Sequence, residues 1–383
     1  MTKVLLLGNC GPILLTVARS CWLQHVELHL LVVSRKQRDC QHHFAGVNSV
    51  VLFSPDLIGT AQGIEAIAKH IKKVGATALI TMGDRNLLWL AEHRQAFEPS
   101  CKVLIQSSES LWQILSKCYQ LEIATSVGFQ ILPVYSLITP NDSESVSDSA
   151  FPLVLRPGRD GDILPAFKVQ IIKSRKQLSN FLQEFHLVQS PIIAQPFMVL
   201  PNLVVHGVRS TEGRVLDSRA YIVSRKFEGV ALSLEPYQFP AQLEQLCNDF
   251  VEQAGITGCY HFDFLFSPEE KMAYFLEINV RMGGTTDKVM QFGYDEPALL
   301  LQAYGVISSL SQIAGTKHVR VVNKRALLKH ILWVIKGKIT ELDYPCVSRY
   351  RHILYSCRDF LFAKDSVFDW RDIRGSLWFH LRK

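Results

Sequence analysis

The 383-residue sequence lacks the features of a secreted or membrane-spanning protein. Its longest late apolar run, 326–335, is interrupted by Lys329 and His330 and cannot span a bilayer. The N-terminal stretch MTKVLLLGNCGP has no small-residue cleavage site and suits a buried first strand better than a signal peptide. The nine cysteines are odd in number and scattered, without a C-x-x-C or Cys/His metal spacing. We therefore expect a cytoplasmic globular protein with mostly buried thiols.

The sequence also lacks groups that several enzyme classes need. It offers no Ser-His-Asp set and no other activated nucleophile. The loop 8–11, GNCG, contains G-x-x-G at best, and the second expected strand ends at Val33 without a following acidic residue. We therefore reject an NAD-binding interpretation and place this loop on the substrate side of the expected sheet, on the same rim as Asp84 and Asn86. For these last two residues, a helix N-cap is the alternative role.

A net positive charge is confined to the C-terminal part of the chain. Residues 311–383 contain 15 Lys and Arg against 6 Asp and Glu, whereas the rest contains 26 against 29. The same part carries several aromatic residues, among them Trp333, Tyr350, Trp370 and Trp378. We favour a folded appendage whose aromatic side chains form a core, and we keep a surface for nucleic acid or an anionic membrane as the alternative.

The most informative stretch is 262–284, FDFLFSPEEKMAYFLEINVRMGG, which predicts two short strands around a polar turn. Alternate side chains of a strand point to opposite faces. The polar faces should carry His261, Asp263, Glu277, Asn279 and Arg281. The apolar faces should carry Phe262, Phe264, Phe266, Leu276, Ile278 and Val280.

A turn centred near Glu270 would place Asp263 opposite Glu277 in the antiparallel register. Two carboxylates in this position repel each other unless a cation lies between them. Asp, Glu and Asn are hard oxygen ligands, which suit magnesium bridging to phosphates. The alternative is a solvated sheet face that happens to be acidic. The neighbouring Asn279, Arg281 and glycine pair 283–284 favour a metal-phosphate site.

The segment FLEINVRMGG resembles the terminal signature of the ATP-grasp superfamily, which includes ATP-dependent carboxylate–amine ligases and carbamoyl-phosphate-synthetase-like enzymes. The resemblance implies that ATP and Mg²⁺ are the cofactors. It also implies that Asp263, Glu277 and Asn279 bind magnesium and that Arg281 contacts the transferring phosphate.

The order of the expected elements fits this resemblance. Alternating strands and helices in the first hundred residues predict a doubly wound α/β unit, and antiparallel strands follow. We expect an α/β and α+β protein, with a Rossmann-like pre-ATP-grasp domain at 1–105 and a two-lobed ATP-grasp fold at 106–315. The smaller lobe should occupy about 115–200, and 316–383 should form a basic C-terminal extension. A single helix is expected at 108–127 and a polar loop at 139–150.

The resemblance also assigns nucleotide contacts. Lys117 matches the first phosphate-binding lysine, although Ser116 replaces the usual Asp before it, and a surface helix lysine is the alternative. Arg156 in PLVLRPG matches the second cation, whose planar fork suits two oxygens at once. The loop after it, RDGDILPAFK, has one glycine where many members have several. Lys168 could replace the missing loop donors or be an ordinary strand-edge lysine.

The segment IIAQPFMVLPNLVVHG resembles the hinge strand that holds adenine and ribose. Gln195 and Asn202 stand where acidic residues are usual, so they keep hydrogen-bonding capacity but lose charge. Met198 should lie against the purine, or else simply pack in a core. Arg225 lies in a basic hairpin that in relatives faces the acyl-phosphate centre.

This resemblance implies an ATP- and Mg²⁺-dependent ligase that converts a small carboxylic acid, such as an amino acid, to an acyl phosphate and transfers the acyl group to an amine. The compact chain and its basic, aromatic tail are most similar to the predicted carboligase group. A nucleotide-binding ATP-grasp protein without ligase activity is the alternative. The partners expected are the acid and the amine, without nucleic acid or a transmembrane segment, and we leave open a homodimer.

Overall fold

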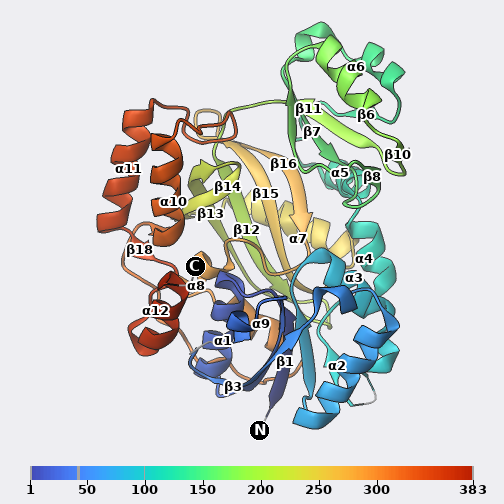
Figure 1. Cartoon of the computed structure of the whole chain (residues 1–383). Coiled ribbons are helices and arrows are strands. Elements are labelled where there is room, and N and C mark those ends of the chain that lie inside the picture. Colours follow the sequence, from blue (N-terminus) through green and yellow to red (C-terminus); the bar gives the residue numbers. More distant parts are fainter. Residues whose placement is uncertain (1, 41–43, 99, 382–383) are drawn as a thin grey trace.

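A five-stranded parallel sheet in the order β3-β2-β1-β4-β5 forms the N-terminal unit of the computed structural model, which describes residues 2–40, 44–98 and 100–381 (Figure 1). Leu5 and Leu7 of β1 contribute to one core with α2 and α3, while Val4 and Leu6 contribute to another with α1. Helices thus cover both faces, as predicted for a doubly wound unit. The unit contains β1 (Lys3–Gly8), α1 (Pro12–Leu23), β2 (Glu27–Val33), β3 (Val47–Phe53), α2 (Ala61–Val74), β4 (Ala78–Thr81), α3 (Asp84–Glu92), β5 (Lys102–Val103) and α4 (Ser108–Ile114).

The single helix expected at 108–127 is two helices, because the chain breaks between α4 and α5 (Lys117–Val127). The side chain of Gln120 holds this break: its Nε2 donates to the carbonyl of Ile114 (2.7 Å), and its Oε1 accepts from the amide of Ile278 (3.0 Å). Lys117 is therefore the first residue of a helix rather than a mid-helix surface lysine.

A four-stranded antiparallel sheet in the order β6-β11-β7-β9 forms a small lobe with its own apolar core. The polar stretch predicted as a loop folds into two short 3-10 helices at Pro140–Ser145 and Asp148–Ala150. The lobe contains β6 (Tyr135–Leu137), β7 (Leu153–Pro157), β8 (Ile163–Leu164), β9 (Gln170–Ile172), α6 (Arg175–Gln183), β10 (Leu187–Val188) and β11 (Ile192–Pro196).

A seven-stranded sheet in the order β16-β15-β12-β13-β14-β17-β18 forms the large lobe and continues into the C-terminal extension. The last two strands of this order, β17 and β18, belong to residues 316–383, so the extension is part of the large sheet and not a separate appendage. The elements are β12 (Asn202–Arg209), β13 (Val215–Phe227), β14 (Val230–Tyr237), α7 (Ala241–Gln253), β15 (Gly258–Ser267), β16 (Met272–Asn279), α8 (Thr286–Gln291), α9 (Glu296–Ala303), β17 (Val321–Val322), α10 (Lys324–Ile335), α11 (Arg349–Phe362), β18 (Lys364–Asp365) and α12 (Ile373–Leu381).

The aromatic residues of the extension are only partly core. Trp333 packs against a small apolar cluster that includes Phe227 and Leu327. Tyr350 and Trp370, in contrast, are 74% and 75% exposed. None of the described helices has the length and apolar character needed to cross a bilayer.

Candidate active site

A cavity of about 660 Å³ lies between the small lobe and the large sheet. One side is cationic, with Lys117 and Arg156, and the facing side is acidic, with Asp263 and Glu277. Its apolar lining consists of Val154, Pro157, Val169, Phe197, Met198, Val199, Val230, Leu265, Leu276 and Leu342. This volume and mixed lining are those of a small-molecule site.

The two carboxylates face each other because of a β-bulge. Near the turn, Phe264 pairs with Phe275, and after the irregularity Asp263 pairs with Glu277. Without the extra residue, Leu276, the same turn would place Asp263 opposite a leucine. The predicted carboxylate pair is therefore confirmed. The expected position of Leu276 on the apolar face is wrong, because the bulge brings this side chain into the cavity.

The two carboxylates have different electrostatic surroundings. Burial disfavours the charge of Glu277, but Lys117 Nζ at 3.8 Å and Arg156 Nη1 at 3.6 Å outweigh it and lower its pKa. Burial, followed by the charge of Glu277, raises the pKa of Asp263 to about 7. The pair thus holds more negative charge than the protein compensates, which is the condition a divalent cation relieves.

Asn279 and Arg281 lie next to this pair but not on the wall of the large cavity. Asn279 Nδ2 donates to Glu277 Oε1 (3.3 Å), and its Oδ1 accepts from Arg281 Nη2 (3.2 Å). Arg281 also binds both oxygens of Asp84 at 2.8 and 3.0 Å. Burial opposes the charge of Arg281, but Asp84 outweighs this and raises its pKa. Arg281 therefore ties the N-terminal unit to the strand that carries Glu277. In the described residues, no three His, Cys, Asp or Glu side chains gather as a metal site, so oxygens of other kinds must complete it.

Of the residues expected to contact the nucleotide besides Lys117 and Arg156, three line the cavity and one lies behind its wall. Lys168, Met198 and Asn202 line the cavity itself. Gln195 lies behind Arg156, whose Nη2 donates to its Oε1 (2.6 Å). Its buried Nε2 has no hydrogen-bond partner. Gln195 thus orients Arg156 in this structure.

Arg225 is not among the residues that line the cavity. It is 3% exposed, and its guanidinium donates to Asp359 (2.8 Å) and Ser356 (2.7 Å) of α11. We therefore leave it out of the candidate site.

Lys226, the next residue, lies in the cavity instead. Its Nζ donates to the carbonyl of Leu200 (2.8 Å) and to Asn202 Oδ1 (3.0 Å). Burial lowers the pKa of Lys226 to about 8, and the nearby Asp263 opposes part of this effect. Strand alternation indicates that neighbouring Arg225 and Lys226 face opposite sides, but the sequence gives no sign of which faces the cavity.

The C-terminal extension forms one wall of the cavity, through residues 341–344. The amide and carbonyl of Tyr344 form bridge hydrogen bonds with those of Lys226 at 3.2 and 2.9 Å. Asp343 is 3% exposed and accepts from the amides of Glu228 (2.5 Å) and Thr340 (2.9 Å). Glu341 forms an ion pair with Lys173 of the small lobe. Sequence patterns offered no signal for this wall, because it depends on tertiary packing.

A smaller chamber of about 140 Å³ continues the cavity past Asp263. It shares Asn202, Lys226, Gly229, Val230 and Asp263 with the large cavity, and its remaining lining is Val204, Val223, Ala231, His261, Gly284 and Thr285. Burial, followed by the neighbouring His206, lowers the pKa of His261 well below its ordinary value, so this imidazole is neutral.

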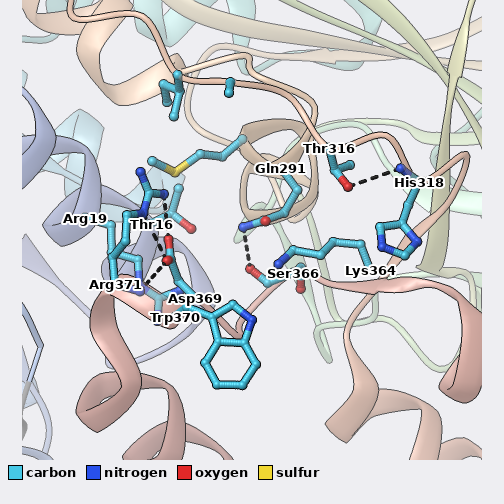
Figure 2. A pocket seen from close by; sticks show the side chains of 13 residues that line it. Thr16, Arg19, Gln291, Thr316, His318, Lys364, Ser366, Asp369, Trp370 and Arg371 are labelled. Atoms are coloured by element: carbon cyan, nitrogen blue, oxygen red, sulfur yellow. Dashed lines mark hydrogen bonds and ion pairs between the residues drawn. The ribbon is translucent and has the colours of Figure 1, made fainter.

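Another cavity, of about 260 Å³, lies where α1, α8 and the extension meet, and Figure 2 shows Trp370 among the side chains around it. Its charged groups already have partners: Arg19 binds Asp372 (2.9 Å), and Arg371 binds Asp369 (2.7 Å). We place the candidate active site in the larger cavity, because that is where like charges face each other.

No protein-family model matches the sequence. Among curated proteins, a carbamoyl-phosphate synthase of Methanobrevibacter smithii is 23% identical over 161 residues. That match covers 40% of this chain and 42% of the synthase, so the chain matches less than half of its curated relative.

Solved structures resemble the chain over most of its length. The biotin carboxylase domain of Hydrogenobacter thermophilus 2-oxoglutarate carboxylase, solved with MgADP, ADP and bicarbonate, has a TM-score of 0.64 at 15% identity and covers 82% of this chain and 72% of its own. An ADP complex of N5-carboxyaminoimidazole ribonucleotide synthetase gives 0.63 at 12% identity, covering 88% and 85%. An L-amino acid ligase of Bacillus licheniformis gives 0.61 at 16%, covering 82% and 75%. The chain therefore has the ATP-grasp fold, as its terminal signature predicted.

Proposed function

We propose that the protein is an ATP- and Mg²⁺-dependent ligase that activates a small carboxylic acid as an acyl phosphate and joins it to an amine. The observation that carries this proposal is the facing pair Asp263 and Glu277, set against Lys117 and Arg156 across a cavity between two lobes. The ATP-grasp fold supports it, since the neighbours named above include complexes with ADP and with MgADP.

The residues present fit a magnesium nucleotide. Asp263 and Glu277 would hold the cation, together with oxygens of Asn279 or of the phosphates, and the cation would supply neutralisation of phosphate charge. Lys117 and Arg156 would bind phosphate oxygens, because they already balance the charge of Glu277 from the small-lobe side. The apolar side chains near the hinge, Phe197 and Met198, would contact the base.

The smaller chamber is where we place the acid. Lys226 lines both chambers and is the one lysine or arginine among the described residues around the smaller chamber, so it would bind a carboxylate there. A carboxylate oxygen would attack the γ-phosphorus of ATP, releasing ADP and forming an acyl phosphate. The amine nitrogen would then attack the acyl carbon, lose a proton and expel inorganic phosphate. The chain's residues would act here by orientation and charge stabilisation rather than as a nucleophile.

Trapping the acyl phosphate tests the proposal without knowledge of the amine. The protein would be incubated with ATP, Mg²⁺, hydroxylamine and one carboxylic acid at a time from a panel that includes the amino acids. We expect an acyl hydroxamate and equimolar ADP with at least one acid, and neither product with Asp263→Asn.

Binding separates the proposal from its alternative. Magnesium-dependent ADP binding without hydroxamate or phosphate release from any acid and amine would favour a nucleotide-binding protein without ligase activity. Absence of adenine-nucleotide binding would contradict both functions.

A further inference from the structure

The helices of the C-terminal extension expose apolar side chains in lines. Along α11, Tyr350, Leu354 and Leu361 are 74%, 51% and 70% exposed, and exposed Cys357 lies between the two leucines. Their spacing of four, three and four residues places them on one side of the helix. Phe362, at the end of the same helix, is 72% exposed.

The neighbouring helix has a second line. Leu328, Leu332 and Ile335 of α10 are 49%, 57% and 63% exposed and are again spaced by four and three residues. The two helices lie side by side at the edge of the molecule (Figure 1). We call these side chains, with those of α11 above, the apolar lines of the extension.

The polarity of α11 is the reverse of what covering a sheet requires. Its buried residues are His352, Ser356 and Asp359, which surround Arg225. A helix whose only task is to cover a core buries its apolar side chains and exposes its polar ones. The folding of the chain therefore does not account for the exposed apolar lines.

The exposed charged side chains that α10 and α11 carry all have one sign. The only acidic residue of α10 and α11 is Asp359, which is 2% exposed and bound to Arg225. Exposed charged residues are Lys329 on α10, Lys336 directly after it, and Arg349, Arg351 and Arg358 on α11. The surface is thus both apolar and cationic.

This combination distinguishes between partners. In a two-fold dimer the same patch meets itself, so these cations would face each other with no exposed carboxylate from either helix to balance them. A nucleic acid would satisfy the cations but leave the aliphatic side chains uncovered, since its interfaces are polar. An anionic lipid surface satisfies both, because aliphatic and aromatic side chains enter the acyl boundary while Lys and Arg bind the headgroups.

We propose that the α10–α11 surface docks the protein peripherally on an anionic lipid bilayer. Segment 370–381 carries further exposed apolar side chains next to the exposed Arg371 and Arg374: Trp370 just before α12, and Ile373, Leu377 and Leu381 on α12, all between 44% and 77% exposed. Tryptophan and tyrosine, present at Trp370 and Tyr350, are the aromatic residues enriched at bilayer interfaces.

Vesicle flotation with the full-length protein tests this inference. We expect the protein to float with vesicles of phosphatidylcholine and phosphatidylglycerol, to bind phosphatidylcholine vesicles at least tenfold more weakly, and to be released by high salt. Leu354→Asp combined with Leu361→Asp should reduce binding at least tenfold. Lys336→Gln and Arg351→Gln should each reduce it about fivefold.

Matched variants on other surfaces control for general effects. Ile138→Asp in the small lobe replaces a side chain that is 52% exposed, and Lys72→Gln removes an exposed charge of α2. Neither should change flotation, and circular dichroism should show that all variants are folded.

Three results would overturn the inference. One is no flotation with anionic vesicles. Another is a dimer in size-exclusion light scattering that the Leu354 and Leu361 variant converts to a monomer, which would make the patch an interface between copies. The third is retention on immobilised RNA or DNA that the same variant abolishes while flotation is unchanged.

Discussion

Asp263 and Glu277 differ in their tendency to ionise, although they face each other across one ladder. Glu277 has Lys117 and Arg156 beside it, and Asp263 has mainly burial and the charge of Glu277. An arrangement that leaves one carboxylate uncompensated costs stability in the metal-free protein. At this site the cost is consistent with a cation as part of the working state.

Replacing Glu277 by Gln should weaken magnesium-dependent nucleotide binding. The variant removes one anionic ligand and leaves Lys117 and Arg156 without their carboxylate, so the affinity for ADP with Mg²⁺ should fall at least tenfold. Calorimetric titration of ADP with and without Mg²⁺ measures this. The control is Glu269→Gln in the exposed turn of the same hairpin, which should bind as the original protein does. An equal loss in both variants would contradict the assignment.

A second residue-scale prediction concerns His330, which is 1% exposed beneath α11. Burial, followed by the charge of Arg225, lowers its pKa to about 4. Below about pH 6.5 the unfolded chain binds a proton here that the folded protein does not, so stability should fall as the pH drops from 6.5 towards 4. The loss assigned to His330 should be about 1–3 kcal/mol at pH 4.

Denaturant unfolding at several pH values measures that loss. His330→Gln keeps an acceptor for Ser356 but cannot titrate, so its stability should depend less on pH over this range. His93→Gln, at an exposed position, should keep the full dependence. Identical pH profiles for His330→Gln and the original protein would refute the prediction.

At the scale of single residues, the structure brings together most of the side chains that the resemblance to the family had placed in the nucleotide site. Lys117, Arg156, Lys168, Met198, Asn202, Asp263 and Glu277 all line the cavity. Arg225, which the resemblance placed at the acyl-phosphate centre, is instead buried against α11, while the next residue, Lys226, lines the cavity.

Among the elements, the β15–β16 hairpin shows where sequence patterns stop being sufficient. A turn centred near Glu270, followed by strict alternation, predicted that Asp263 pairs with Glu277. In the structure, the turn changes the pairing of the two strands by one residue, and the bulge changes it back by one residue. The two shifts cancel at Glu277, while Leu276 between them changes face. Bulges of this kind depend on tertiary contacts, here with Arg156, whose Nη2 donates to the carbonyl of Leu276 (3.4 Å).

Segment 341–344 gives an element-scale prediction. Asp343→Ala should leave the amides of Glu228 and Thr340 without their acceptor, lowering the free energy of unfolding by about 1–3 kcal/mol. Because this segment also bridges to Lys226, ADP affinity should fall several-fold. Thermal denaturation and calorimetry measure the two effects.

The neighbouring ion pair supplies the control for this prediction. Glu341→Gln removes an exposed contact with Lys173, which should be worth less than about 1 kcal/mol. If Asp343→Ala binds ADP as tightly as Glu341→Gln, the segment does not shape the nucleotide cavity.

On the scale of the whole molecule, the extension is held to the large sheet by a buried ion pair. Asp359 binds Arg225 at 2.8 Å and Arg320 at 2.6 Å, and both Arg225 and Asp359 are almost fully buried. Removing residues 316–383 would therefore unpair Arg225 and remove a cavity wall together. Deletion consequently cannot separate the role of the extension from nucleotide binding.

The substitution Asp359→Asn separates the structural role of the extension from nucleotide binding. It should lower the free energy of unfolding by about 3–5 kcal/mol, because a buried guanidinium loses its charged partner. At a temperature where the variant is still folded, its ADP affinity should stay within about twofold of the original, since Arg225 does not line the cavity. A large loss of affinity without a loss of stability would return Arg225 to the active site.

The walls of the cavity come from positions as far apart as Lys117 and Tyr344. During synthesis, the small lobe can fold as it leaves the ribosome because its core contains only its own residues, whereas the N-terminal unit shares both of its cores with the large lobe. The proposed nucleotide pocket is complete only when segment 341–344 has emerged and docked against Lys226. Under the proposed function, a product truncated before this point would lack one wall of the nucleotide pocket and would gain less stabilisation from ATP than the finished protein would.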